Sequence, residues 1–89
     1  MYDETTNCLK ALAHPLRLLI IDSLKDGPLC VSEIENVTGS SQSNISQHLA
    51  LLRKCNILET YREKNNIYYR VENWRIFQFV DRAKELFHA

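Results

Sequence analysis

Glycine, proline and long apolar runs are all scarce in this sequence of 89 residues. Two glycines and two prolines exclude collagen-like and linker-rich chains and allow few forced turns, so helices should dominate. No apolar run exceeds four residues, as in Leu18 to Ile21, whereas a membrane-spanning helix needs roughly 20. The segment from Met1 to Glu4 has acids where a secretory signal would have bases, so we expect a cytoplasmic protein without membrane contact.

Catalytic motifs are also missing. The sequence has no glycine-rich phosphate loop, no carboxylate pair in an apolar setting and no nucleophile with a recognisable base, so an enzyme is not expected. At 10.4 kDa there is room for one domain, which we place over residues 1–89. Because a chain this short buries only about 60–65% of its unfolded surface, self-association would stabilise it.

Acidic residues are absent between Glu35 and Glu59, although the whole chain has eleven acids and eleven bases. Residues 37–89 carry eight basic and five acidic side chains, whereas residues 1–36 carry three and six. Salt screens charges that lie more than about 8–10 Å away, so a local basic excess can attract phosphate in a formally neutral protein. A nucleic-acid partner is therefore compatible with a net charge of zero.

Apolar spacing predicts a mainly α chain with a β-hairpin (α+β), in the order ααααββα. We expect helices over about 3–12, 15–25, 31–37, from a cap at Ser40 or Ser41 to 54, and from a cap at Asn73 to the end. The hairpin strands are expected over 57–63 and 67–71, joined by a turn whose asparagines tolerate positive φ. The second helix is apolar almost all round, which indicates a buried central position.

The helix ending near residue 54 has an unusual outer face of short neutral side chains in place of lysine and glutamate. Serine and asparagine lower helix stability, but hydroxyls and amides can bond base edges and phosphates in a major groove. A long polar capping region is the alternative interpretation. With the helix before it and the turn at residues 38–40, this helix forms a helix-turn-helix, whose second helix enters the groove.

The hairpin that follows is interpreted as a wing that reaches phosphates or the minor groove, or else as a solvated turn. The candidate DNA-binding residues are Ser41, Gln42, Ser43, Ser46, Gln47, His48 and Arg53 on the helix and Arg62, Lys64 and Asn65 on the hairpin. The apolar stripe of this helix follows the i, i+4, i+7 pattern in Ile45, Leu49 and Leu52. His48 lies one residue from this stripe, so two roles are open for it: a hydrogen bond inside the motif, or a contact with DNA.

The last helix carries a large aromatic stripe at spacings of three and four. So short a chain cannot cover this stripe alone, so we expect a homodimer held by the first and last helices, with core packing as the alternative role. The candidate interface residues are Leu9, Trp74, Phe77, Val80 and Phe87.

Four segments resemble the ArsR/SmtB family of bacterial transcriptional repressors. They are residues 11–18 (ALAHPLRL), 31–34 (VSEI), 41–53 (SQSNISQHL, then LR after two residues) and 68–71 (YYRV). The resemblance implies a homodimeric winged helix-turn-helix repressor that binds a double-stranded DNA operator and leaves it on a metal, metalloid or redox signal. A small dimeric protein-interaction module without DNA binding is the alternative, and a steep salt dependence of DNA binding distinguishes the two.

The sequence departs from this family where inducers bind. Residues 30–32 read Cys-Val-Ser where arsenic and cadmium sensors have Cys-Val-Cys, and residues 81–83 lack the histidine of zinc-type sites. Arsenite or a soft divalent metal needs further ligands beside Cys30. These could be Cys8, within the chain or across the dimer, or a ligand from outside the protein. Oxidation of these two thiols and the absence of any cofactor are the alternatives, while Cys55 is expected to pack as a small hydrophobe.

Overall fold

The computed structural model describes residues 3–88. Its helices are α1 (Asp3–Leu12), α2 (Pro15–Ser23), α3 (Val31–Thr38), α4 (Gln42–Lys54) and α5 (Arg75–Phe87). Strands β1 (Leu29–Cys30), β2 (Leu58–Glu63) and β3 (Asn66–Val71) form an antiparallel sheet in the order β1-β3-β2. The predicted helices and hairpin are confirmed, but the N-cap of α5 is Trp74 instead of Asn73, whose side-chain oxygen still accepts a hydrogen bond from the N–H of Arg75 at 3.0 Å. Strand β1 is an addition to the predicted order.

Strand β1 escaped prediction because two residues cannot show an alternating pattern. Its residues become a strand through pairing, since Leu29 lies opposite Tyr69 and Cys30 opposite Tyr68 in β3. This pairing connects the start of α3 to the hairpin, so the helix-turn-helix and the hairpin form one unit.

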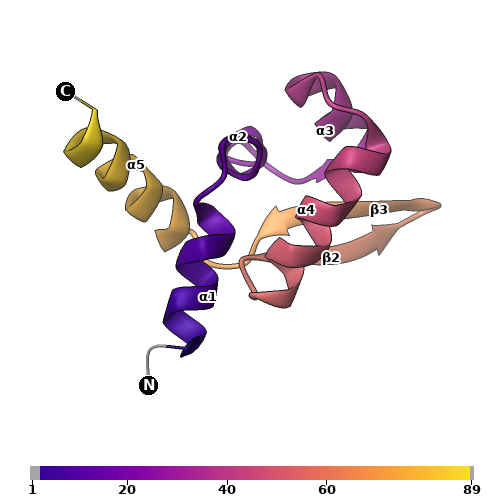
Figure 1. Cartoon of the computed structure of the whole chain (residues 1–89). Coiled ribbons are helices and arrows are strands. Elements are labelled where there is room, and N and C mark those ends of the chain that lie inside the picture. The colour runs from indigo at the N-terminus through magenta and orange to yellow at the C-terminus, as the bar shows by residue number, and fades with distance from the viewer. Residues whose placement is uncertain (1–2, 89) are drawn as a thin grey trace.

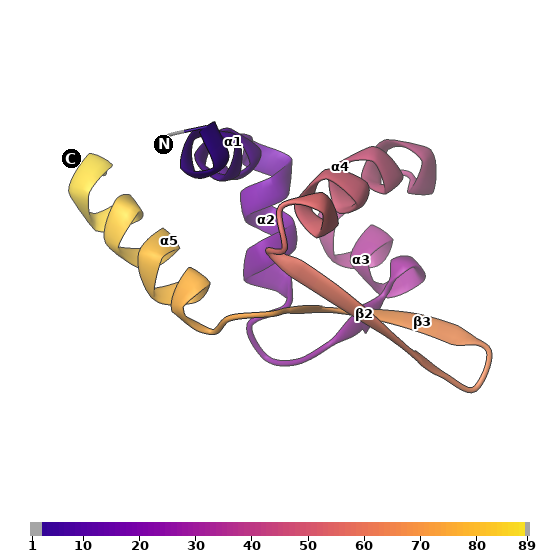
Figure 2. The same cartoon turned by 90° about the horizontal axis from the view of Figure 1, so that it is seen from below.

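The core lies where α2, α3, α4 and the base of the hairpin meet. Figures 1 and 2 show α1 and α5 on one side of this core and the hairpin tip extending away on the other. The largest fully buried side chains are Ile20, Ile21, Ile34, Ile45, Leu49 and Leu52. Those of α4 follow the predicted i, i+4, i+7 spacing, which leaves the opposite face of α4 to solvent.

Helix α2 differs from its prediction in two respects. It ends at Ser23, with Leu24 as the C-cap, instead of continuing to residue 25. It is also not buried all round, because Leu19 is 42% exposed. At its start, His14 accepts a hydrogen bond from the N–H of Leu16 (3.1 Å), and the proline that follows His14 occupies the first helical position.

Left-handed backbone conformations end the helices of the motif and form the hairpin tip. Gly39 (φ 71°) ends α3, and Asn56 (φ 59°) follows the end of α4. At the hairpin tip the left-handed residue is Lys64 (φ 55°), so the expectation that an asparagine takes this conformation was wrong. The register Glu63 opposite Asn66 gives the two turn positions to Lys64 and Asn65, so Asn66 belongs to β3 and not to the turn.

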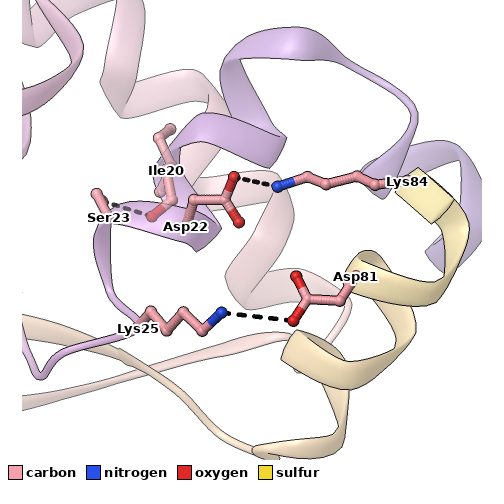
Figure 3. A network of polar contacts seen from close by, with 6 residues as sticks. All are labelled: Ile20, Asp22, Ser23, Lys25, Asp81 and Lys84. Atoms are coloured by element: carbon pink, nitrogen blue, oxygen red, sulfur yellow. Dashed lines mark hydrogen bonds and ion pairs between the residues drawn. The ribbon is translucent and has the colours of Figure 1, made fainter. Parts of the chain in front are cut away.

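Helix α5 is attached to α2 (Figure 3). Lys84 of α5 contacts Asp22 of α2 at 2.6 Å, and Lys25, which follows the end of α2, contacts Asp81 of α5 at 3.4 Å. Exposed pairs of this kind stabilise a protein by about 0–1 kcal/mol each, so the burial of Val80 contributes more to docking. Within residues 3–88 no helix is both long and apolar enough to span a membrane.

Candidate nucleic-acid interface

The polar face of α4 is exposed along its length. Ser41 is the N-cap, and its Oγ accepts a hydrogen bond from the N–H of Asn44 at 3.3 Å. The Asn44 side chain donates to the Ser40 hydroxyl at 2.7 Å, and Ser46 donates to the carbonyl of Gln42 at 2.7 Å. Several of the short polar side chains therefore form hydrogen bonds at the start of the helix or within it, in agreement with the capping interpretation.

The two glutamines on this face are different. Among the described residues neither Gln42 nor Gln47 has a side-chain hydrogen bond within the chain, and both side chains are exposed. Their amides keep a free donor and a free acceptor, the pair of groups that reads an adenine edge. Hydrogen bonds within or at the start of the helix account for the hydroxyls of Ser41 and Ser46 but not for these two side chains.

His48 lies further along α4 and is turned inward. Its Nδ1 accepts a hydrogen bond from Nε of Arg17 at 3.0 Å, and its ring centroid lies 4.6 Å from that of His14. Burial lowers the pKa of His48, and the charges of His14 and Arg17 lower it further. The hydrogen bond that the structure shows for His48 comes from Arg17 of α2, outside the helix-turn-helix of α3 and α4, and a contact of His48 with DNA stays a prediction.

Arg17, which the sequence motifs did not single out as functional, joins three helices. Besides the bond from its Nε to His48 on α4, its Nη1 donates to the carbonyls of Lys10 and Ala11 at 3.3 Å each. Those two carbonyls lie in the last turn of α1 and Arg17 itself belongs to α2. The guanidinium therefore fixes the middle of α4 relative to α1.

Four basic side chains, at the end of α4 and near the hairpin tip, have no carboxylate partner in the described part of the chain. The ion pairs found among residues 3–88 connect α2 or the turn after it with α5, join residues within α5, or cross the hairpin between Arg70 and Glu59. Exposed cations at the end of α4 and on the hairpin take part in none of these pairs: Arg53, Lys54, Arg62 and Lys64. Their charges remain available to an external anion.

The hairpin is stiffened by contacts that the sequence did not reveal. Tyr61 and Tyr68 lie opposite each other and stack with ring centroids 5.5 Å apart. The Arg70 guanidinium lies 5.2 Å from the Tyr61 centroid and contacts Glu59 at 2.6 Å. These pairs hold the two strands together below the hairpin tip. Arg62, Lys64 and Asn65, at and beside the tip, are exposed.

The candidate dimer residues divide between core and surface. Val80 is buried and Phe77 packs partly against the core, whereas Trp74 is 63% and Phe87 82% exposed. Leu9 is half exposed and lines an apolar cavity of about 380 Å³ with Phe79 and Phe87. Phe79 and Leu86 extend this exposed apolar face, although neither belonged to the predicted stripe.

The cysteines are arranged differently from the expected pair of Cys8 and Cys30. The Cys30 sulfur contacts the hydroxyl of Ser32 at 3.2 Å, while the Cys8 sulfur contacts the carbonyl of Cys55 at 3.8 Å. Cys55 also packs against the core, which agrees with its predicted packing role. In the described part of the chain no three His, Cys, Asp or Glu side chains are grouped so as to hold a metal ion.

Comparisons with known proteins agree with this geometry. A family model described as "Bacterial regulatory protein, arsR family" matches residues 14–60. A biofilm growth-associated repressor of Xylella fastidiosa is 37% identical over 87 residues, which cover 98% of this chain and 76% of that protein. The crystal structure of NolR from Sinorhizobium fredii has a TM-score of 0.86 at 36% identity and covers 98% of this chain and 87% of that one.

A second solved structure is the homodimeric winged helix-turn-helix DNA-binding domain of a possible ArsR-family transcriptional regulator from Mycobacterium bovis. It has a TM-score of 0.85 at 28% identity and covers 94% of this chain and 78% of that one. The family model, the relative and both structures agree with the resemblance found in the sequence. The chain therefore belongs to the arsR family of bacterial regulatory proteins, which are DNA-binding transcriptional regulators and not enzymes.

Proposed function

We propose that this protein is a cytoplasmic homodimeric repressor that binds a palindromic DNA operator. The observation that carries the proposal is the exposed face of α4, where Gln42 and Gln47 keep free amides, together with exposed cations at the end of α4 and on the hairpin that have no carboxylate partner among residues 3–88. In a helix-turn-helix the second helix lies in the major groove, which assigns base reading to α4. The exposed cations of the hairpin then contact phosphates or the adjacent minor groove.

The roles of the two groups of residues differ. A glutamine that binds adenine discriminates against the wrong base pair by about 1–3 kcal/mol, whereas a lysine or arginine on a phosphate binds every sequence alike. Counterion release makes the second contribution salt-dependent. Base readers and phosphate binders can therefore be separated by measuring both sequence preference and salt dependence.

The test begins with selection of a preferred duplex from a random pool, followed by fluorescence anisotropy on that duplex and on a scrambled one. Gln42→Ala and Gln47→Ala should lower affinity for the preferred duplex about 5- to 100-fold with little change on the scrambled duplex. Arg62→Ala and Lys64→Ala should weaken both duplexes alike and reduce the salt slope by about one each. Arg82→Ala, on α5, is the control and should leave both affinities unchanged.

Equal losses on both duplexes for the glutamine variants would refute the assignment of α4 as the reading helix. Wild-type protein that binds neither duplex, or binds without salt dependence, would favour the protein-interaction module instead.

Dimerisation is the second part of the proposal. The apolar face formed by Leu9, Phe79, Leu86 and Phe87 is exposed in one chain, and it lies on the opposite side of the core from the hairpin tip (Figure 2). A two-fold copy across this face would cover these side chains. It would also present two reading helices about one turn of DNA, roughly 34 Å, apart.

Phe87→Asp tests the interface more cleanly than Phe77→Asp, because Phe77 packs against the core of its own chain and its loss would also unfold the monomer. Phe87→Asp is expected to shift sedimentation at micromolar concentration from dimer to monomer while circular dichroism keeps its helical signal. Wild-type protein that sediments as a folded monomer would exclude this part of the proposal.

The signal that releases the operator is a metal, metalloid or thiol oxidant in this proposal. Within one chain Cys30 is a single thiolate beside Ser32, whereas a soft ion such as arsenite takes about three thiolates. A site at Cys30 would therefore need a ligand from the partner subunit or from outside. Titration of reduced protein with arsenite or cadmium, comparing wild type with Cys30→Ser, shows whether Cys30 takes part in release.

A further inference from the structure

Two of the three cysteines lie side by side although 47 positions separate them in the sequence. Cys8 is on α1, and Cys55 is the C-cap of α4. The Cys8 sulfur lies 3.8 Å from the carbonyl oxygen of Cys55, and the Cys55 sulfur lies 4.0 Å from the carbonyl oxygen of Asn7. The Cys8 sulfur thus contacts the backbone of Cys55, and the Cys55 sulfur contacts the backbone of the residue before Cys8.

The two thiols are accessible to small molecules. Both cysteines are partly exposed, and both line a cavity of about 620 Å³ between α1 and the end of α4. Residues Asp3, Asn7, Lys54 and Asn56 also line this cavity, so its rim is polar. A soluble peptide thiol or disulfide can enter such a cavity.

The Cys55 thiol also changes the pKa of the Cys8 thiol. Burial raises the pKa of the Cys8 thiol, and the Cys55 thiol raises it further, through charge repulsion and through a side-chain hydrogen bond. The contacts that bring the two thiols into one neighbourhood are those of each sulfur with a backbone carbonyl at or next to the other cysteine. Cys30 has no cysteine partner among the contacts of the described residues, and its sulfur contacts the hydroxyl of Ser32.

We propose that Cys8 and Cys55 are a redox-active dithiol that closes to an intramolecular disulfide and so ties α1 to the C-terminal end of α4. The backbone at Cys55 can adjust for this step, since the helix ends there and Asn56 follows in a left-handed conformation. The site differs from the pair of Cys8 and Cys30 expected from the sequence, and it needs no metal and no partner subunit.

Oxidised glutathione, a small soluble disulfide, is a sufficient oxidant. The thiolate of one cysteine attacks its S–S bond, which gives a mixed disulfide and releases one glutathione thiolate. The thiolate of the other cysteine then attacks the protein sulfur of this mixed disulfide, forms the bond between Cys8 and Cys55 and releases the second glutathione. Two protein thiols are oxidised, and the two glutathione molecules take up both electrons and both protons.

The experiment uses the full chain, reduced and then equilibrated with mixtures of reduced and oxidised glutathione at about pH 8. Closure should lower the intact mass by two hydrogen atoms and the number of free thiols from three to one per chain. Digestion without reductant should yield the Cys8 peptide joined to the Cys55 peptide. Cys30→Ser should close like the wild type, whereas Cys8→Ser and Cys55→Ser should stop at the mixed disulfide with glutathione.

Thermal melting supplies a second readout. Because the bond closes a long loop, the melting temperature of oxidised Cys30→Ser should exceed that of the reduced form by about 10 °C. A joined peptide that contains Cys30, a disulfide between two chains, or wild-type protein that forms only mixed disulfides would overturn the proposal.

The effect of the bond on DNA rests on the proposed function, whereas the bond itself does not. Since α4 is the proposed reading helix, oxidised and reduced Cys30→Ser should differ at least about threefold in affinity for the preferred duplex. Equal affinities would overturn this link to DNA binding. If neither form binds DNA, the proposed function fails while the mass, thiol and peptide results still decide whether the dithiol exists.

Discussion

Arg17 is the residue whose removal most directly tests how α4 is held in place. The substitution Arg17→Met keeps an apolar stem of similar length and removes the guanidinium. Three hydrogen bonds are lost, one to His48 at 3.0 Å and two to the last carbonyls of α1 at 3.3 Å each. The Nδ1 of half-buried His48 is then left without its donor.

The expected loss of stability follows from these contacts. A hydrogen bond from a charged group is worth about 1.5–3 kcal/mol, but the two longer bonds here are partly or fully exposed and contribute less. We therefore expect the free energy of unfolding to fall by about 2 kcal/mol, which lowers the melting temperature of a domain this size by roughly 10 °C. Removal of the nearby positive charge should also raise the pKa of His48, which burial will still hold below its ordinary value.

Urea unfolding gives the first quantity, and NMR titration of the imidazole protons gives the second. Arg82→Met is the matched control, because Arg82 is highly exposed and pairs only with Glu85 on its own helix at 3.5 Å. That control should stay within about 0.5 kcal/mol of the wild type. A result for Arg17→Met equally close to the wild type, together with an unchanged pKa of His48, would show that Arg17 does not join these helices in solution.

Two further predictions concern pH and backbone conformation. Because the folded state lowers the pKa of His48, the unfolded chain binds more protons just below its ordinary value of about 6.5, so stability should fall as pH drops through this range. His48→Gln should flatten that part of the curve of urea midpoint against pH, and an unaltered curve would contradict the prediction. Gly39→Ala meets no atom within 4 Å but keeps a φ of 71°, so backbone strain alone should cost about 1 kcal/mol in urea unfolding. A neutral or stabilising result at this position would mean that α3 ends differently in solution.

Much of the fold was predictable because its signals are local. The stripe of Ile45, Leu49 and Leu52, the N-cap at Ser41 and the glycine at residue 39 all act within a few positions of the structure that they specify. What escaped prediction depends on contacts between distant positions. Strand β1 exists only through its pairing with β3, some 40 positions later, and two residues give no periodic signal.

The site shows the same division. The exposed face of α4 follows from the apolar stripe on its other side, so its polar residues could be assigned from the sequence. The sequence could not show which of these side chains remain without a partner in the chain, because the bonds of Ser46 to Gln42 and of Asn44 to Ser40 depend on side-chain conformations. The Arg17 contact with His48 spans 31 positions, and no pattern in the sequence joins them.

Helix α1 connects the proposed dimer face with the proposed reading helix α4. Its ten residues make a rod about 15 Å long. Leu9 of α1 lies on the exposed apolar face, while the adjacent Cys8 contacts the end of α4 and the last carbonyls of α1 receive the Arg17 guanidinium. A rigid rod cannot shift at one of these contacts without moving at the others. A covalent bond at Cys8 would therefore act on both the proposed dimer face and the reading helix, whereas a change at Cys30 would reach α4 only through α3 and the turn at Gly39.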